Sequence, residues 1–282
     1  MKKFFSRTLA ALPVFLDTRS NQWITQTQVN KLMADSSIVF VGEQHDHVLG
    51  HKMEFDLLKA FCQESANSRI GLSLEMFERD TQSYVTGYMG LQTTERFFKD
   101  FSRPWPNYDT DYRPLVEYIK NSTKNSQVIA ANIPRRYASL VANGREHDLS
   151  TMPDVEKSYM AEEIFAPKDQ YWELFRENFK EWPIEKVERY YRAQCIKDDT
   201  MAMSIAQFHK SCQGEPCKVF SVTGSFHVNY HLGTFQRVKL RLPEQKLLLI
   251  VVLPWDETKE INRDEFLKLA DVVVFVEENK EE

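Results

Sequence analysis

The sequence predicts an α/β fold in which helices flank a mostly parallel central sheet, and two observations support this class. Several short apolar runs rich in β-branched residues are typical of strands that are buried on both faces. Segments with helical periodicity separate these runs, and strands that alternate with helices usually pair in parallel. Because 282 residues can bury one large core, we expect a single α/β domain over residues 1–282.

The predicted elements follow one another in a regular order. The strands are expected at 38–41, 69–77, 128–133, 218–223, 246–253 and 271–276. A helix is expected over about 49–64, directly after the first strand. Two longer helical stretches rich in aromatic residues, about 80–125 and 147–205, interrupt the alternation. We expect these two stretches to pack together as a helical cap or small second lobe.

Composition excludes some classes of function. The net charge is -5 and no basic stripe carries interleaved aromatic residues, so we expect no nucleic-acid partner. No run of 18 apolar residues occurs, so no membrane span is expected. The cysteines form no CxxCH motif, which excludes covalent attachment of c-type haem. Aromatic residues make up 12% of the chain, which fits either core packing or a flat apolar ligand site.

The beginning of the sequence resembles a poor signal peptide. Lys2 and Lys3 precede a mostly apolar segment at 9–16, but Arg7 interrupts the pattern and no clean cleavage site follows. No lipobox cysteine is present there. We therefore expect a soluble protein of the periplasm or the cytoplasm.

Polar side chains follow four successive predicted strands. They are Glu43 with His45, Glu75, Asn132 with Arg135, and His227. The carboxyl ends of parallel strands lie on one edge of a sheet, which is where open α/β sheets place their ligands. The sequence therefore predicts one shared site at this edge.

This set of residue types leaves several kinds of chemistry open. Carboxylates and imidazoles bind divalent metals such as Zn or Mn, act as general base and acid, or orient another ligand. Glu43 and Glu75 could instead be structural carboxylates held by Arg135 or by backbone donors. Next to them, Asp46 could cap the following helix. His47 could be a solvated loop residue, and His51 a buried histidine bonded to backbone.

A second polar cluster lies in the helical stretch at 190–202. If this segment is a helix, one of its faces carries Tyr191, Gln194, Asp198, Met201 and Ala202. Two of them, Gln194 and Asp198, could form hydrogen bonds towards the sheet edge. A surface helix with a polar seam is the alternative.

Five motifs resemble those of the ChaN-like haem-binding lipoproteins, a family in one superfamily with the TIKI/TraB proteins and the erythromycin esterases. The motifs are Gly42-Glu43-Gln44-His45-Asp46 with His51 (GExHD…H), Leu74–Arg79 (LEMFxR), Ala131–Arg135 (ANxPR), Tyr191 with Gln194, Asp198 or Asp199, Met201 and Ala202 (YxxQxxxDxxMA), and Gly224–Val228 (GxxHV). They occur in the family's order over roughly 37–277.

The resemblance implies an α/β fold, binding of haem, in some members as two stacked haems in a homodimer, and a place in iron acquisition. It also implies that a tyrosine holds the iron with help from a histidine. Tyr190, Tyr191 and Tyr230 are the possible ligands, and Tyr191 is preferred because it lies inside the matching motif. Such a phenolate needs a pKa well below ~10, which Fe(III) and a nearby Arg or His can provide. Further cofactor-binding residues are then His45, Asn132, Arg135, Gln194 and His227.

Three hypotheses about function result. The first is a haem-binding protein of bacterial iron uptake or haem handling, in which aromatic residues of the helical lobe cover the macrocycle. The second is a hydrolase of the same superfamily, with Glu43, His45, Glu75 and His227 as metal ligands or general base and acid. In that case Arg135 would stabilise an anion. The third is an inactive fold used as an interaction module.

Overall fold

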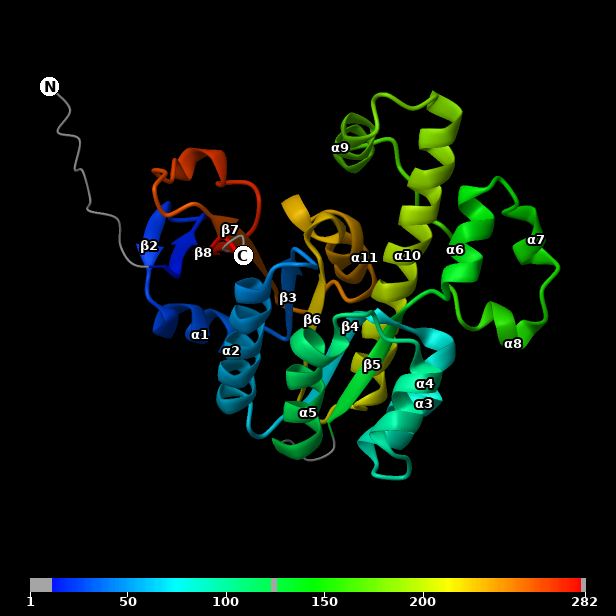
Figure 1. Ribbon diagram of the computed structural model, residues 1–282, viewed down its shortest axis with the longest axis horizontal. Coiled ribbons are helices and arrows are strands. Elements are labelled where there is room, and N and C mark those ends of the chain that lie inside the picture. The colour runs from blue at the N-terminus through cyan, green and yellow to red at the C-terminus, as the bar shows by residue number, and fades with distance from the viewer. Residues whose placement is uncertain (1–11, 123–125, 280–282) are drawn as a thin grey trace, which may run out of the picture.

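A single eight-stranded sheet, in the order β2-β1-β8-β7-β3-β6-β4-β5, forms the centre of the computed structural model, which describes residues 12–122 and 126–279 (Figure 1). The strands are β1 (Val14–Asp17), β2 (Gln22–Ile24), β3 (Ile38–Glu43), β4 (Arg69–Glu78), β5 (Gln127–Asn132), β6 (Cys217–Gly224), β7 (Leu247–Trp255) and β8 (Val272–Glu277). Strands β3 to β8 pair in parallel, and β1 pairs antiparallel with both β8 and β2. The predicted α/β class with a mostly parallel sheet is confirmed.

The strands expected from the sequence all form, with bounds shifted by one or two residues. The sequence did not predict β1 and β2, which extend one edge of the sheet. The part of the possible signal peptide at residues 1–11 lies outside the described residues. None of the helices in the described part of the chain is long and apolar enough to cross a membrane.

Helices and short helical turns connect the strands on both faces. The helices are α1 (Gln26–Ala34), α2 (Val48–Glu64), α3 (Gln82–Met89), α4 (Glu95–Ser102), α5 (Arg113–Ser122), α6 (Arg135–Ala142), α7 (His147–Ser150), α8 (Asp154–Lys157), α9 (Gln170–Asn178), α10 (Ile184–Ser211) and α11 (Gly233–Arg241). The helical turns are η1 (Arg79–Thr81), η2 (Tyr108–Tyr112), η3 (Ser225–His227), η4 (Asn229–His231) and η5 (Arg263–Glu265).

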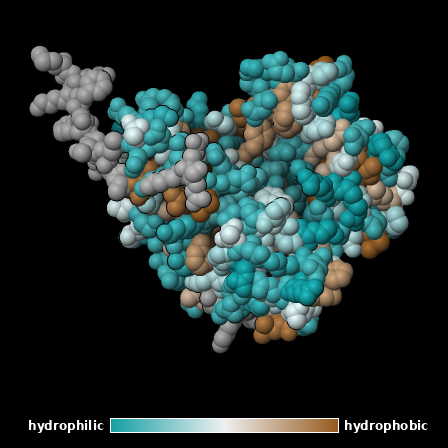
Figure 2. Space-filling model, in the orientation of Figure 1, coloured by the Kyte–Doolittle hydropathy of each residue, from teal (hydrophilic) through white to brown (hydrophobic). Residues whose placement is uncertain are grey.

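A helical lobe projects beyond the sheet, as the sequence predicts. It consists of α9 and the first half of α10, which we call the arm, together with α6 to α8 (Figure 1). The space-filling view shows the surface hollowed between the arm and the body of the molecule (Figure 2). The stretch at about 147–205, together with α6 before it, builds this lobe. The stretch at about 80–125 lies elsewhere, because its side chains belong to the core that α2 shares with the sheet.

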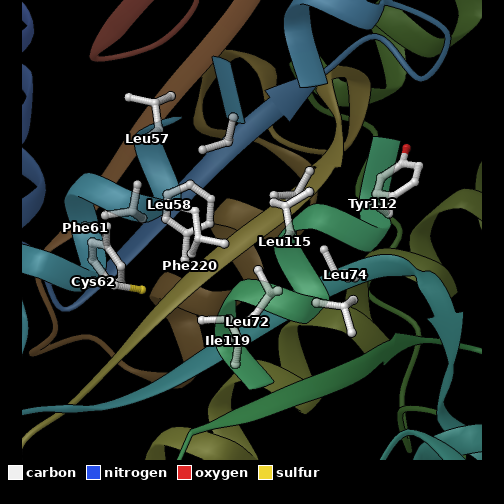
Figure 3. Close-up of a cluster of buried hydrophobic side chains, with 14 of the residues drawn as sticks. Leu57, Leu58, Phe61, Cys62, Leu72, Leu74, Tyr112, Leu115, Ile119 and Phe220 are labelled. Carbon is white, nitrogen blue, oxygen red and sulfur yellow. The ribbon is translucent and has the colours of Figure 1, made fainter. Parts of the chain in front are cut away.

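The sheet separates two cores because successive side chains of a strand point to opposite faces. On one face, β-strand residues such as Phe220 pack against α1 to α5, including Leu57, Leu58 and Phe61 of α2 (Figure 3). On the other face the strands pack against α10 and α11. Each strand end therefore presents one side chain to the α2 face and the next to the α10 face.

Candidate functional site

Strands β3, β4 and β6 end side by side, and their last residues form the predicted shared rim. Glu43 of β3 is in register with Gly224 of β6, and β4 is in register with β6 up to Leu74 and Val222. The next residue of β4 is Glu75. Its Oε2 accepts hydrogen bonds from the Gly224 backbone nitrogen at 2.8 Å and from a threonine hydroxyl of β6 at 2.7 Å. The two carboxylates are neighbours at one rim but lie on opposite faces of the sheet.

On the α2 face, Glu43 belongs to a buried polar group that we call the α2-side cluster. Its members are Glu43, His51, Glu54, Asp111 and Tyr112. The Tyr112 hydroxyl donates to Glu43 Oε1 at 2.6 Å. His51 Nδ1 lies 3.0 Å from Glu54 Oε2 and 3.4 Å from Glu43 Oε2. His51 Nε2 donates to the backbone carbonyl oxygen of His45 at 2.9 Å.

Proton affinities in the α2-side cluster are strongly perturbed. Burial and the nearby Glu43 carboxylate raise the pKa of Glu54, which is completely inaccessible to solvent. Burial by itself lowers the pKa of His51, but Glu54 and Glu43 outweigh burial and raise it to about 9. Both groups therefore bind their protons more tightly in the folded protein than they would in water.

His45 connects the two faces of the rim. Its Nδ1 donates to Glu43 Oε1 at 2.7 Å, and its ring stacks edge-on against Trp105 with centroids 4.6 Å apart. Its Nε2 lies over Gly224, so close that a Cβ at that position would be 2.8 Å away. A glycine is needed there for His45 to reach across the end of β6. The side chain of His45 is 41% exposed, so a ligand can reach this imidazole.

On the α10 face, Glu75 belongs to a second polar group, the α10-side cluster, in which all side chains are buried except the half-buried Gln194. The members of this cluster are Glu75, Tyr171, Gln194, Asp198 and His227. His227 Nδ1 donates to Asp198 Oδ1 at 2.7 Å, and its Nε2 lies 3.3 Å from Glu75 Oε1. The Tyr171 hydroxyl donates to Asp198 Oδ2 at 2.8 Å. Gln194 Nε2 lies 3.2 Å from His227 Nε2.

The charges of the α10-side cluster stabilise one another. Burial alone disfavours the imidazolium of His227, but Glu75 and Asp198 raise its pKa to about 9. Burial would raise the pKa of Glu75, yet His227, His45 and the Gly224 backbone amide hold it well below its usual range. Burial also lowers the pKa of His45, and its hydrogen bond to Glu43 together with the charge of Glu75 reverses this into a net increase.

The remaining residues of the opening motif and of the ANxPR motif belong to neither the α2-side nor the α10-side cluster. His47 is not solvated: it is buried, and its Nδ1 accepts from the Gly50 backbone nitrogen at 2.9 Å. It is therefore His47, and not the exposed Asp46, that caps α2. Asn132 ends the edge strand β5, where it is in register with Glu78 of β4, three residues beyond Glu75. Its side-chain oxygen accepts a hydrogen bond from the backbone nitrogen of the next residue. Arg135 is exposed at the start of α6.

The three tyrosines differ sharply in accessibility. Tyr191 is buried in the arm, where its hydroxyl donates to the Pro167 backbone carbonyl at 2.6 Å, and burial raises its pKa. Tyr230 packs partly buried between two apolar clusters. Tyr190 is 36% exposed and packs edge-on against Trp182, with centroids 5.0 Å apart.

Comparison with known proteins identifies the family to which this site belongs. A protein-family model described as "Haem-binding uptake, Tiki superfamily, ChaN" matches residues 29–238. The chain belongs to this ChaN family. Among curated proteins, no sequence matches the chain.

Two solved structures share the fold of this ChaN-family chain. One is ChaN of Campylobacter jejuni, described with cofacial haem binding, at a TM-score of 0.67 and 16% identity, covering 93% of this chain and 96% of that one. The other is a mutant of the erythromycin esterase EreC in its open conformation, at a TM-score of 0.50 and 12% identity, covering 84% of this chain and 76% of that one. At these identities the similarity shows the fold alone.

The sequence did not reveal every residue of the ChaN-family rim. Glu54, Asp111, Tyr112 and Tyr171 were missed, although they contact the predicted site residues directly. A signal did exist for Glu54, because it lies on the same helical face as His51, Leu58 and Phe61. A carboxylate inside an apolar stripe must have a partner in the core.

Proposed function

We propose that this ChaN-family protein binds haem in the hollow between the arm and the sheet rim. The observation that supports this most directly is the position of Tyr190. It stands one helical turn before Gln194 on the same face of α10, and Gln194 contacts His227 at the rim. An accessible phenol and the accessible imidazole of His45 thus flank the same polar rim, and both are established ligand types for haem iron.

The arm offers the macrocycle an aromatic wall. Ring contacts run without a break from Phe226 at the rim through Phe175 and Phe179 to Trp182 and Tyr190, with centroid distances between 4.6 and 6.0 Å. Three of these rings, at 179, 182 and 226, are only partly buried. A flat apolar ligand gains most by covering such rings. The residues present therefore fit a haem as the bound cargo.

We assign the iron-binding phenol to Tyr190 rather than to Tyr191. The family motif favours Tyr191, but its hydroxyl already donates to Pro167 inside the arm. To bind iron, Tyr191 would have to lose this hydrogen bond and leave its buried position. The partly exposed Tyr190 needs neither change.

His45 is the histidine that assists. The Glu43 carboxylate accepts from Nδ1, which fixes the ring orientation and leaves Nε2 directed at the rim. A proton held on Nε2 would donate to an iron-bound phenolate or to a haem propionate. Arg135, exposed at the start of α6, would pair with a propionate.

Hemin titration of the purified protein tests this proposal. Wild type should give a shifted Soret band, Tyr190→Phe should lose it, and Tyr191→Phe, the matched control one residue away, should keep it. Loss of the band in Tyr191→Phe with retention in Tyr190→Phe would reverse the assignment. No Soret shift in wild type would reject haem binding.

The family implies uptake of haem, and the Campylobacter jejuni relative is described with cofacial haem binding. For this chain we propose that two protein copies enclose two stacked haems and that the protein serves in bacterial iron uptake. Sedimentation with and without hemin measures this: addition of hemin should convert monomer to homodimer. A monomer that binds one haem and stays a monomer would contradict it.

A hydrolase is the second candidate, and the pairing of Glu43 with His45 favours it. A buried carboxylate that orients an accessible imidazole is the arrangement of a general base, and the charged His227 beside it could serve as acid. Ester hydrolysis that disappears in His45→Ala would support this role, and activity retained in that variant would remove it. The third hypothesis, an inert module, fits less well because His45 and Tyr190 remain accessible.

A further inference from the structure

We propose that the α2-side cluster is a binding site for one divalent metal ion, held by Glu43, His51 and Glu54. Each of these residues offers one ligand atom, and the three atoms lie within 4.8 Å of one another. Atoms that close together can contact a single ion after small side-chain movements, because ligand distances in such sites are about 2.0–2.2 Å. All three residues are buried, so the site would be enclosed by protein.

Two carboxylate oxygens in this cluster lack a hydrogen-bond partner in the described part of the chain. They are Glu43 Oε2 and Glu54 Oε1, and each has almost no contact with solvent. Buried carboxylate oxygens are normally satisfied by donors, because an unpaired buried oxygen has lost its hydrogen bonds to water without replacement. Glu43 Oε2 lies 3.4 Å from His51 Nδ1, and the other carboxylate oxygen of Glu54, Oε2, lies 3.0 Å from the same nitrogen. A cation held by both carboxylates would give these buried oxygens the partner that they lack.

The hydrogen bonds around the cluster prepare these ligands for a metal. His51 Nε2 faces the backbone carbonyl of His45, which can only accept, so this nitrogen carries a hydrogen. A metal that displaced the proton from Nδ1 would meet a lone pair directed towards Glu54 and Glu43. Metal-binding histidines commonly donate their second nitrogen to a carbonyl or carboxylate in this manner.

Hydrogen bonds also fix the orientation of the Glu43 carboxylate. Glu43 Oε1 accepts from the Tyr112 hydroxyl and from His45 Nδ1, so only Oε2 remains free for an ion. Two carboxylates with one imidazole suit first-row divalent ions such as Mn²⁺ and Zn²⁺ better than Mg²⁺ or Ca²⁺, which prefer oxygen ligands alone. The ion would lie on the α2 face, separated by β6 from His227 and the proposed haem-binding hollow. The ion and the haem would therefore occupy different faces of the sheet, although Glu43 would contact both the ion and His45.

The alternative occupant is a proton. Glu54 could stay protonated and share its proton with Glu43, while His51 stays charged. This arrangement would also relieve the repulsion between the carboxylates, and it predicts no tight metal binding.

Calorimetric titration of haem-free, chelator-treated full-length protein with Mn²⁺ and with Zn²⁺ distinguishes these occupants. Wild type should bind one equivalent of at least one ion, and Glu54→Gln should bind at least tenfold more weakly. Glu75→Gln is the matched control, because it alters a buried carboxylate beside a histidine at the same rim but in the α10-side cluster, and it should bind as wild type does. No binding by wild type, or equal binding by Glu54→Gln, would overturn the proposal.

Spectroscopy of the wild-type protein supplies a readout that needs no variant. Electron spin echo modulation of bound Mn²⁺ should show one coupled imidazole nitrogen from His51. Bound Mn²⁺ without nitrogen modulation would also overturn the assignment. The same concentration of metal should raise the melting temperature of wild type and of Glu75→Gln by similar amounts, and that of Glu54→Gln by less.

Discussion

Replacement of Asp198 by Asn tests whether the α10-side cluster holds His227 as an imidazolium. In the wild type both side chains are buried, and His227 Nδ1 donates to Asp198 Oδ1 at 2.7 Å. Asparagine keeps the size of the side chain and can still accept from Tyr171, but it removes the negative charge. Loss of one partner from a buried charge pair costs about 3–5 kcal/mol. We expect a decrease of that size in the free energy of unfolding at pH 6.5.

The pH dependence gives the more specific test. The pKa of His227 rises from 6.5 in the unfolded chain to about 9 in the fold. At about 1.4 kcal/mol per pKa unit, this increase corresponds to about 3 kcal/mol of stability. Because the folded pKa is the higher one, this stability is complete below pH 6.5 and is lost as the pH rises through about 9. The deficit of Asp198→Asn relative to wild type should therefore shrink between these two values.

Asp199→Asn is the matched control. Asp199 is the next residue of α10 and equally buried, but it pairs with Arg237 at 3.2 Å and with Arg241 at 3.0 Å. Guanidinium groups stay charged throughout this range, so the deficit of the control should stay constant with pH. Urea unfolding followed by circular dichroism at several pH values measures both deficits. A deficit of Asp198→Asn that does not change with pH would refute the reasoning. A deficit of Asp199→Asn that shrinks equally between pH 6.5 and about 9 would also refute it.

Three further predictions concern other contacts of the rim. Tyr112→Phe removes the buried hydroxyl that donates to Glu43, and urea unfolding should show a loss of about 1–3 kcal/mol, whereas an unchanged midpoint would contradict this contact. Gly224→Ala places a Cβ 2.8 Å from the tip of His45; hemin titration should show weaker binding, while the free energy of unfolding changes by less than about 1 kcal/mol. Gly233→Ala forces a side chain onto a backbone with φ of +52°, 2.2 Å from a backbone carbonyl oxygen, and should cost more than about 2 kcal/mol in the same unfolding assay.

The strands and the shared rim were predictable because their signals are local. A run such as 38–41 is apolar at every position and rich in β-branched residues, which is typical of a strand buried on both faces. Parallel pairing then brings the residues after β3, β4 and β6 to one edge whatever the strand order is. The hairpin of β1 and β2 lacks such a signal, because it consists of strands of four and three residues around a polar turn.

The choice between Tyr190 and Tyr191 could not be made from the sequence. Neighbouring residues of a helix point about 100° apart, so Tyr190 and Tyr191 face different surroundings. Which one faces the inside of the arm depends on how α9 packs against α10, and the ring of Tyr191 meets those of Trp172 and Phe175 there. Tertiary packing therefore decides which phenol a ligand can reach.

The two faces of the rim are coupled through His45. Its proton affinity is raised by Glu43 on the α2 face and by Glu75 on the α10 face, and it is lowered by the charge of His227. A cation on the α2 face would withdraw negative charge from Glu43 and so lower the pKa of His45. A ligand that neutralised His227 would act in the opposite direction. Any function that uses the accessible imidazole therefore depends on the charge state of both clusters, although β6 separates them.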